Sequence, residues 1–399
     1  MQAVILAGGK GTRLRPFTLE APKPMYPVAG RAFIDRLLEQ VRSFGITEVL
    51  LLLGYKAEVL IQYLEAHPHP GLSVDYSVTP EEFETGARIR AASHKIKGDF
   101  LLMYCDNYCP ISFEAHLRAF EESGALVRLM AYANRDGYTK NNLCVKDGQV
   151  LVYDKERKRE GLNAVDIGYA LLSRKVLDWL PEEAALSFER YVYQKALEKK
   201  GLFADVTEHR YYSIGSFERM KRTECFFSGQ RAVFLDRDGT INVRPPKACY
   251  VERPEEFVWL AGAREAIKRL NDAQYLVLLV SNQPGLARGQ LTPAGLKAIH
   301  QKMERELRQT GARIDGIYIC PHNWDEGCAC RKPQPGLLYQ AQRDYDLNIP
   351  RDCILIGDDE RDIEAADRAD CRAVLVTEDY PLSRVVDDIL GGMDHAENR

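Results

Sequence analysis

Four largely apolar runs stand out along this chain, at residues 3–7, 48–53, 232–235 and 275–280, and only the second contains a charged residue, its first, Glu48. Runs of this length without polar alternation predict strands that are buried on both faces of a parallel sheet. The first run ends at Gly8-Gly9 and the third at Asp236, so each leads from a strand into a polar loop. The pattern predicts the α/β class, with two Rossmann-like domains in series.

The domain boundary is predicted near residues 226–230, where FFSGQ gives a short polar break before the second opening strand. A chain of 399 residues is too long for one ordinary hydrophobic core, so two domains are expected. The predicted domains are residues 1–228 and 229–399, and the terminal HAENR is expected to be a frayed end.

Composition narrows the class of partner. With 45% hydrophobic and 28% charged residues the chain is globular, and a net charge of −4 gives no electrostatic basis for binding nucleic acid or a membrane. Small-molecule chemistry is the better expectation. No basic leader precedes MQAVILAGG and no apolar run is long enough to cross a bilayer, so a cytoplasmic protein is expected. The ten cysteines are then expected to be reduced thiols.

One short segment combines thiols, an imidazole and cations. Its metal-ligand candidates are Cys320, His322, Cys328 and Cys330. Four such soft or borderline ligands suit a closed tetrahedral zinc site of the structural kind. The metal would stiffen the loop and fix the next two residues, Arg331 and Lys332, at the edge of a site that recognises anions. The alternative is a set of free thiols beside a chance histidine.

The loop after the first strand is suited to phosphate binding. Its glycines, Gly8, Gly9 and Gly11, let the backbone approach a triphosphate closely and expose N–H groups to it. Lys10 and Arg13 can neutralise phosphate charge. Taken alone, this pattern is only moderately specific.

The loop continues into PKPM and PVAG, which completes the pattern GGxGTRLxPxTxxxPKPMxPVxG. Over residues 1–225 the chain thereby resembles the sugar-1-phosphate nucleotidyltransferases. The resemblance implies a nucleotidyltransferase fold in which a sugar 1-phosphate attacks the α-phosphorus of a nucleoside triphosphate and pyrophosphate leaves. It also implies roles for Arg13 at the α- and β-phosphates, for Lys23 at the phosphates and for Asp106 as a magnesium ligand.

Further positions follow from the same resemblance. Thr85 and Gly86 occupy the place of the nucleobase loop, although Glu84 and Arg88 stand where small residues are usual. Lys155 matches the lysine that meets the sugar phosphate. Asp166 lies in DIGY, where the family usually reads NAGIY.

One departure concerns the transferase metal site. The family usually supplies an aspartate from a DIG or DTG motif, and here the matching stretch is Ser213-Ile214-Gly215. A hydroxyl is a weak neutral ligand for magnesium, so either another acid compensates or the transferase is slow or inactive. Asp205 and Asp166 are the candidate acids.

The second opening strand leads into a different set of motifs. They are, in chain order, Asp236 and Asp238 in DRDGT, Ser281, Lys332 and Asp358. All follow predicted strands or the metal loop, at the carboxyl edge where open α/β sheets bind ligands. Over residues 230–378 the chain resembles the haloacid dehalogenase superfamily.

The superfamily resemblance implies magnesium-dependent phosphatase chemistry. Asp236 would attack the phosphate to form an aspartyl-phosphate, and Asp238 would act as general acid and base. Magnesium would lie between Asp236, the Asp238 carbonyl and Asp358, while Ser281 and Lys332 bind the transferring oxygens. Asp359 and Asp362 are expected to support the metal site.

Within the superfamily, the combination of DRDGTIN, SNQ, ARG and the CPH…CxCRKPxPG loop resembles the D-glycero-D-manno-heptose 1,7-bisphosphate 7-phosphatases. Histidinol-phosphate phosphatases share much of it, and Asp359 stands where many heptose enzymes carry a lysine. The substrate-binding residues implied are Thr240, Asn282, Arg288 and Arg331.

The fusion of the two domains favours the heptose assignment, because a 7-phosphatase yields the sugar 1-phosphate that a transferase consumes. The expected substrates are heptose bisphosphate and a nucleoside triphosphate. GTP and the α-anomer are favoured, because heptose transferases with the GGxGTRL signature belong to the GDP-activated route. The alternatives are a transferase of other sugar specificity or a non-catalytic module, and a homo-oligomer is left open.

Overall fold

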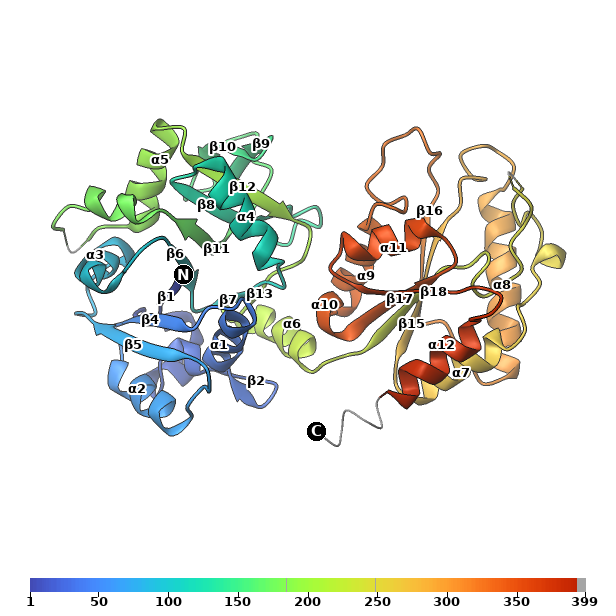
Figure 1. Cartoon of the computed structure of the whole chain (residues 1–399), viewed down its shortest axis with the longest axis horizontal. Coiled ribbons are helices and arrows are strands. Elements are labelled where there is room, and N and C mark those ends of the chain that lie inside the picture. Colours follow the sequence, from blue (N-terminus) through green and yellow to red (C-terminus); the bar gives the residue numbers. More distant parts are fainter. Residues whose placement is uncertain (184, 248, 393–399) are drawn as a thin grey trace. The chain divides into compact units, whose positions relative to one another are not determined.

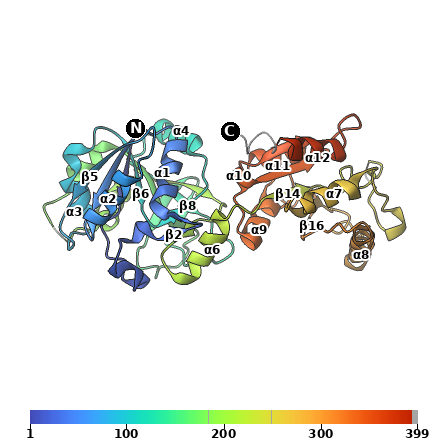
Figure 2. The ribbon, with the colours of Figure 1, turned by 90° about the horizontal axis from the view of Figure 1, so that it is seen from below.

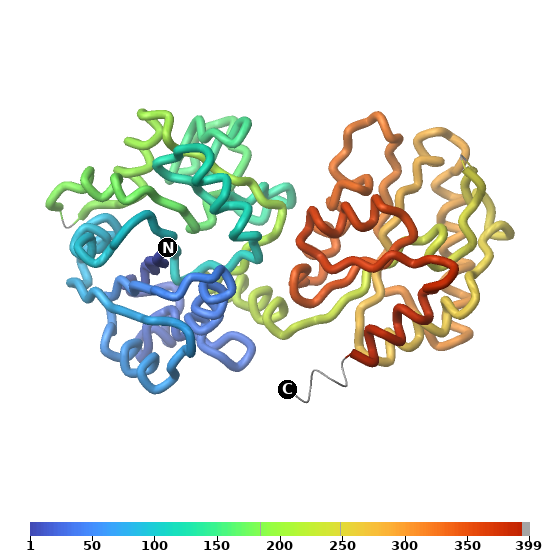
Figure 3. Tube along the Cα trace, in the orientation of Figure 1, coloured from blue at the N-terminus to red at the C-terminus, as the bar shows by residue number. Residues whose placement is uncertain are grey.

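The computed structural model describes residues 1–183, 185–247 and 249–392, so the predicted frayed end at HAENR lies outside the described residues. The chain forms two compact units, Met1–Glu224 and Cys225–Arg399. Figure 3 follows the backbone from helix α6 (Phe217–Phe227) into strand β14 (Ala232–Leu235). No helix in the described ranges is long and apolar enough to span a bilayer.

The N-terminal unit is built on a nine-stranded mixed sheet (Figure 1). In spatial order its strands are β5 (Ser73–Val78), β4 (Glu48–Leu53), β1 (Gln2–Leu6), β6 (Phe100–Tyr104), β11 (Val165–Leu172), β8 (Val127–Tyr132), β12 (Leu202–Thr207), β10 (Gln149–Tyr153) and β9 (Leu143–Lys146). The predicted strands at residues 3–7 and 48–53 are confirmed as the parallel pair β1 and β4. Strand β11, by contrast, runs antiparallel to both its neighbours.

Helices and short strands complete this unit. Its helices are α1 (Phe33–Ser43), α2 (Ala57–Ala66), α3 (Thr85–Ala91), α4 (Phe113–Ser123), α5 (Gln194–Glu198) and most of α6, which crosses the boundary after Glu224. A two-stranded sheet pairs β7 (Asn107–Tyr108) with β13 (Tyr212–Ser213), and a hairpin pairs β2 (Pro27–Val28) with β3 (Arg31–Ala32). The β7–β13 pairing brings the end of the unit back beside the loop that follows β6.

The C-terminal unit has a five-stranded, wholly parallel sheet (Figure 2). Its strands, in spatial order, are β16 (Gly316–Cys320), β15 (Leu276–Asn282), β14, β17 (Cys353–Gly357) and β18 (Arg372–Leu375). Its helices are α7 (Ala263–Asp272), α8 (Pro293–Gln309), α9 (Gly336–Tyr345), α10 (Ile349–Asp352), α11 (Glu360–Asp367) and α12 (Leu382–Gly391). The predicted strands at residues 232–235 and 275–280 are confirmed as β14 and β15.

The apolar runs of β14 and β15 are explained by cores on both faces of this sheet. Along β14, Val233 and Leu235 join the core formed with α7, α8 and α12, whereas Ala232 and Phe234 join the core formed with α9 and α11. Because side chains alternate between the faces of a strand, a strand covered on both faces must be apolar at every position. The polar groups of the unit therefore gather where the strands end.

Two candidate active sites

In the C-terminal unit, polar residues meet at the carboxyl ends of three neighbouring strands. Asp236 directly follows β14, Ser281 lies near the end of β15 and Asp358 directly follows β17. These strands are adjacent and parallel, so their ends share one edge of the sheet. The predicted residues are thus brought together as the motif order suggested.

Lys332 links this edge to the cysteine-rich loop. Its side chain is 3% exposed, and Nζ lies 2.8 Å from Asp236 Oδ1 and 2.5 Å from Asp362 Oδ1, while it donates to the Val280 carbonyl at 3.0 Å. Burial alone would lower the pKa of Lys332, but the carboxylates of Asp236 and Asp362 raise it above its usual value. Lys332 is therefore a buried cation between two acids.

Asn282 fixes the position of Lys332. The Asn282 side chain donates to the Lys332 carbonyl and accepts from its backbone N–H, both at 3.0 Å. This reciprocal pair fastens the loop to the end of β15. Asn282 also lines a cavity that lies over this edge of the sheet, so the residue predicted to bind substrate has a structural contact as well.

Three carboxylates converge beside Lys332. Ligand atoms of Asp236, Asp358 and Asp362 lie within 4.8 Å of one another, and Oδ1 of Asp358 is buried without a hydrogen-bond partner. Burial, followed by the charge of Asp236, raises the pKa of Asp358 to about 6. Oxygen ligands in this arrangement suit a hard divalent cation. The cluster includes Asp362, which the sequence placed only in support of the metal.

Three buried polar side chains hold the carboxylate of Asp238 in place. Its carboxylate accepts hydrogen bonds from Arg237 at 2.8 Å, from Asn242 at 2.9 Å and from Gln283 at 2.9 Å. Burial pushes the pKa of Asp238 upward, but Arg237 and the other donors outweigh burial and hold it below the usual value. Arg237 and Gln283 were not predicted from the sequence, although Arg237 lies between two predicted residues.

The cavity over these groups has a volume of about 690 Å³ and a cationic lining. Six of its lining residues are basic, Arg244, Lys247, Arg288, Arg331, Lys332 and Arg361, against four acids, Asp236, Asp238, Asp359 and Asp362. Arg288 donates to the Tyr250 hydroxyl at 2.7 Å and to Asn323 at 3.0 Å, so it is held in place at the wall. Thr240 is buried and does not line the cavity, unlike the other predicted substrate-binding residues.

The cysteine-rich loop has the geometry of a metal site. Sγ of Cys320 lies 3.6 Å from both Nδ1 of His322 and Sγ of Cys328, and Cys330 Sγ lies 3.2 Å from His322 Nδ1 and 3.6 Å from Cys328 Sγ. Ligands at about 2.3 Å from a tetrahedral ion are about 3.7 Å apart. The four predicted ligands are therefore spaced as the edges of such a tetrahedron, and the cluster could bind a metal ion.

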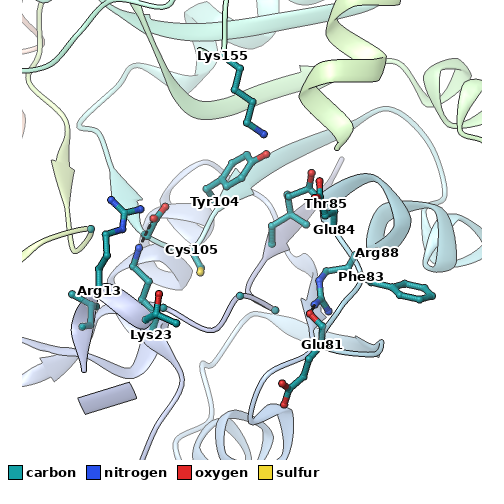
Figure 4. Close-up of a pocket in the computed structure, with 18 residues that line it drawn as sticks. Arg13, Lys23, Glu81, Phe83, Glu84, Thr85, Arg88, Tyr104, Cys105 and Lys155 are labelled. Carbon is teal, nitrogen blue, oxygen red and sulfur yellow. Dashed lines mark hydrogen bonds and ion pairs between the residues drawn. The ribbon is translucent and has the colours of Figure 1, made fainter. Parts of the chain in front are cut away.

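The N-terminal unit has a cavity of about 450 Å³ over the end of β1 (Figure 4). Eight predicted residues line it: Gly8, Gly9, Gly11, Arg13, Lys23, Thr85, Asp106 and Lys155. Figure 4 shows Arg13 and Lys23 together on one side, with Lys155 reaching in above Tyr104. Lys155 comes from the turn that follows β10. Nζ of Lys23 lies 2.5 Å from Oδ2 of Asp106, so a cation and an acid already face each other there.

Gly86 and Asp166 do not line this cavity. Gly86 packs against Leu186, whose side chain would lie 2.7 Å from an added Cβ. Asp166 accepts from the Tyr153 hydroxyl at 3.2 Å and from the Gly168 N–H at 2.9 Å. Their predicted roles in substrate binding are not supported by direct exposure to the cavity.

Arg88 has a clear structural position. It is 4% exposed and donates to the Leu53 carbonyl at 2.8 Å and to the Thr79 hydroxyl at 2.6 Å. A Cβ on Gly8 would lie 2.5 Å from the Arg88 guanidinium. Glycine at position 8 therefore leaves room for the buried arginine behind this loop.

Ser213 pairs with the residue that follows Asp106, the predicted magnesium ligand, but its hydroxyl is bonded to the backbone. It pairs with Asn107 across β7–β13, is 2% exposed, and its hydroxyl accepts from the Gly215 N–H at 3.0 Å. Asp205, one candidate replacement, pairs instead with Arg128 and His116. Neither Asp205 nor Asp166 lines the cavity. Of the acids predicted to hold magnesium in this unit, Asp106 is therefore the one that reaches it.

Sequence reasoning missed Glu189. This buried carboxylate accepts hydrogen bonds from Lys155 and Thr85, two predicted residues that are 70 positions apart in the sequence numbering. Its segment carries no phosphate-binding motif. The spacing of residues along the chain gave no signal for it, because the contacts form only when three separate segments meet.

Comparison with known proteins gives a different family for each of the two units. Residues 2–141 match the nucleotidyl transferase family model, and residues 329–380 match the HAD-hydrolase-like model. The D-glycero-beta-D-manno-heptose-1,7-bisphosphate 7-phosphatase of Bordetella bronchiseptica is 44% identical over 146 residues, which cover 37% of this chain and 80% of that protein. The D-glycero-alpha-D-manno-heptose-1,7-bisphosphate 7-phosphatase of Mycobacterium bovis is 37% identical over 137 residues, covering 34% and 72%.

Among solved structures, one from Bacillus anthracis described as a glucose-1-phosphate thymidylyltransferase aligns with a TM-score of 0.51 at 16% identity. It covers 57% of this chain and 95% of that one, and it supports the nucleotidyltransferase fold. The chain therefore carries a nucleotidyltransferase domain at its N-terminus and belongs, through its C-terminal unit, to the heptose-1,7-bisphosphate 7-phosphatase family of HAD-like hydrolases.

Proposed function

We propose that this chain is a bifunctional enzyme of nucleotide-activated heptose synthesis. Its C-terminal unit removes the 7-phosphate of D-glycero-D-manno-heptose 1,7-bisphosphate, and its N-terminal unit transfers a nucleotidyl group to the resulting heptose 1-phosphate. The observation that carries the proposal is the buried contact of Lys332 with Asp236 at the mouth of a cationic cavity, in a unit 44% identical to a heptose bisphosphate phosphatase.

In the phosphatase unit, an Asp236 oxygen forms a bond to phosphorus while the bond to the sugar oxygen breaks. In its protonated form Asp238 gives a proton to the leaving oxygen. As the carboxylate, which its lowered pKa favours, it then takes a proton from the water that hydrolyses the aspartyl-phosphate. Lys332 and Ser281 neutralise and hold the transferring oxygens. Asp236, Asp358 and the Asp238 carbonyl would hold Mg²⁺, with Asp362 beside them, and the ion would supply further charge neutralisation.

A structural zinc ion fits the loop that carries Lys332. Cys320, His322, Cys328 and Cys330 form a closed set of four ligands, with no position left open for substrate. The ion would supply rigidity rather than chemistry. The basic side chain of Arg331, directly after the last ligand, then lines the cavity at a fixed place.

In the transferase unit, a phosphate oxygen of the sugar 1-phosphate attacks the α-phosphorus of the nucleotide, and pyrophosphate leaves. Arg13 and Lys23 face the triphosphate, and Lys155 meets the sugar phosphate. Asp106 would hold Mg²⁺, which supplies charge neutralisation. Transfer of this kind depends mainly on positioning and electrostatics, which these cations provide.

We favour GTP as the nucleotide and the α-anomer of the sugar. The support for both is the GGxGTRL signature. The matched phosphatases do not choose the anomer, because the one from Bordetella bronchiseptica is named for the β-anomer and the one from Mycobacterium bovis for the α-anomer. A direct test is to measure orthophosphate release from each bisphosphate anomer, and pyrophosphate release from each nucleoside triphosphate with heptose 1-phosphate. Equal rates with all nucleotides would contradict the guanylyl assignment.

A second candidate for the N-terminal unit is a non-catalytic module that binds sugar phosphate. The observation in its favour is Ser213, whose hydroxyl is bonded to the Gly215 N–H where the family carries a metal-binding aspartate. Pyrophosphate release from any sugar 1-phosphate and nucleotide would reject this candidate. Restoring the acid by Ser213→Asp should raise the rate of release if the present site is short of metal affinity.

A further inference from the structure

We propose that Glu189 is a positioning residue that holds Lys155 at the sugar-phosphate end of the N-terminal cavity and joins it to Thr85 at the nucleobase end. The inference rests on the proposed transferase function and adds a residue to that site. Glu189 itself is 5% exposed and lies behind the cavity wall.

The carboxylate of Glu189 collects three donors on one oxygen. Oε2 accepts from Lys155 Nζ at 3.0 Å, from the Ser187 hydroxyl at 2.7 Å and from the Thr85 hydroxyl at 3.2 Å. A buried carboxylate is stable only when it is paired and hydrogen-bonded. Thr85 and Lys155 line the cavity of about 450 Å³, and Ser187 lines a neighbouring cavity of about 390 Å³ that Lys155 also borders.

Lys155 needs such an anchor because it faces two cavities. It lines the cavity of about 450 Å³ and a second one of about 390 Å³, and its side chain is 42% exposed. A lysine ammonium on a flexible four-carbon stem would otherwise sample both cavities, and fixing it when substrate binds would cost conformational entropy. Glu189 and Ser187, which also contacts Nζ at 3.0 Å, select one position.

The contact with Thr85 connects the two ends of the site. Thr85 is the first residue of α3, and its hydroxyl also accepts from the backbone N–H of Phe188 at 2.9 Å. Glu189 begins a π-helical turn, Glu189–Tyr193, an irregularity often found at functional sites. One carboxylate thus touches the residue expected near the base and the residue expected near the sugar phosphate.

A buried ion pair contributes little net stability compared with apolar side chains of the same size. Stability of the fold is therefore a weak reason for a carboxylate at position 189. The role that we assign to it is to hold the ammonium of Lys155 in place. If so, removing the Glu189 charge and removing the Lys155 ammonium should damage the same step, and removing both should be no worse than removing Lys155.

The test combines Glu189→Gln, Lys155→Met and the double variant in the full-length protein. With saturating GTP, each single change should lower kcat/KM for heptose 1-phosphate by about 10- to 100-fold, as misplacement of a contact group by about 1 Å does. The double variant should match Lys155→Met. The matched control is Glu156→Gln, which neutralises an exposed acid paired with Arg190 and should leave kcat/KM unchanged.

A second readout does not depend on turnover. Labelling of Lys155 by trinitrobenzene sulfonate can be followed by peptide mass spectrometry. The rate should be about 5-fold higher in Glu189→Gln, because loss of a partly exposed ion pair shifts the equilibrium between the paired and the free ammonium by about that factor. If Glu189→Gln fails to fold, Glu189→Asp keeps the charge one methylene short and should label at an intermediate rate.

Additive losses in the double variant, or labelling of Lys155 at the wild-type rate in Glu189→Gln, would overturn the inference. If the unaltered protein releases no pyrophosphate, the proposed transferase function fails, and the labelling rates alone decide whether Glu189 holds Lys155.

Discussion

At the scale of single residues, the phosphatase account depends on one buried cation. Lys332 lies 2.8 Å from Asp236 and 2.5 Å from Asp362, with almost no contact with solvent. Such a group can both lower the repulsion between the two acids and hold the oxygens of a transferring phosphate. Its removal should therefore affect stability and catalysis together.

We expect Lys332→Met to lower orthophosphate release by at least about 100-fold, the usual effect of losing a donor to transition-state charge. It should also destabilise the C-terminal unit by about 3 kcal/mol, because two buried carboxylates lose their partner. Steady-state kinetics and thermal unfolding measure the two effects. Lys332→Arg keeps the charge and should recover stability more than rate; a Met variant with wild-type kcat would contradict the role.

Gly239 offers a test of the acidic cluster. Its φ of +97° lies in the region that favours glycine, and an added Cβ would collide with the Asp358 carboxylate. Gly239→Ala should weaken magnesium-dependent activity and lower the melting temperature. The control is Gly289→Ala, where φ is +71° and nothing lies near the added Cβ, so only backbone strain of about 1 kcal/mol is expected. Equal effects at both glycines would argue against crowding of Asp358.

At the scale of elements, the strands were predictable and their directions were not. Apolar runs identified β1, β4, β14 and β15, because strands covered on both faces have no polar positions. Nothing in the local sequence of β11 signals that it runs antiparallel between β6 and β8, since direction follows from the path of the whole chain.

The candidate sites show the same difference between what local sequence signals and what depends on the path of the whole chain. Residues within motifs, such as Asp236 and Lys23, were found because their spacing is tied to a loop that follows a strand. Arg237 and Gln283 stand in the motifs DRDGT and SNQ but were given no role, because their contact with each other and with Asp238 forms only when the two motifs meet. Glu189 lies outside any motif, and its partners come from distant segments. Asp166 lies in a matching motif but points into bonds with Tyr153 and Gly168 rather than into the cavity.

The cysteine-rich loop is the element whose order is expected to depend on a metal. Cys328→Ser should lower zinc content and melting temperature together, and it should slow orthophosphate release because the loop carries Lys332. Inductively coupled plasma mass spectrometry and thermal unfolding measure this. Cys225→Ser, at an exposed cysteine outside the cluster, should change neither quantity. A Cys328→Ser protein with full stability and no zinc would rule out a structural ion.

At the scale of the whole molecule, the product of the reaction proposed for one unit is the substrate of the reaction proposed for the other. Removal of the 7-phosphate leaves a sugar 1-phosphate, which is what a nucleotidyltransferase consumes. Asp236→Asn should block nucleotide-heptose formation from the bisphosphate, since an amide is no nucleophile, but should leave formation from heptose 1-phosphate intact.

The central claim is tested most directly by phosphorus NMR of the full-length protein with Mg²⁺, heptose 1,7-bisphosphate and GTP. The account predicts that orthophosphate appears first, followed by pyrophosphate and a nucleotide-heptose in equal amounts. Orthophosphate without pyrophosphate, with GTP or any other nucleoside triphosphate, would contradict the bifunctional assignment and leave a heptose bisphosphatase joined to an inactive transferase domain.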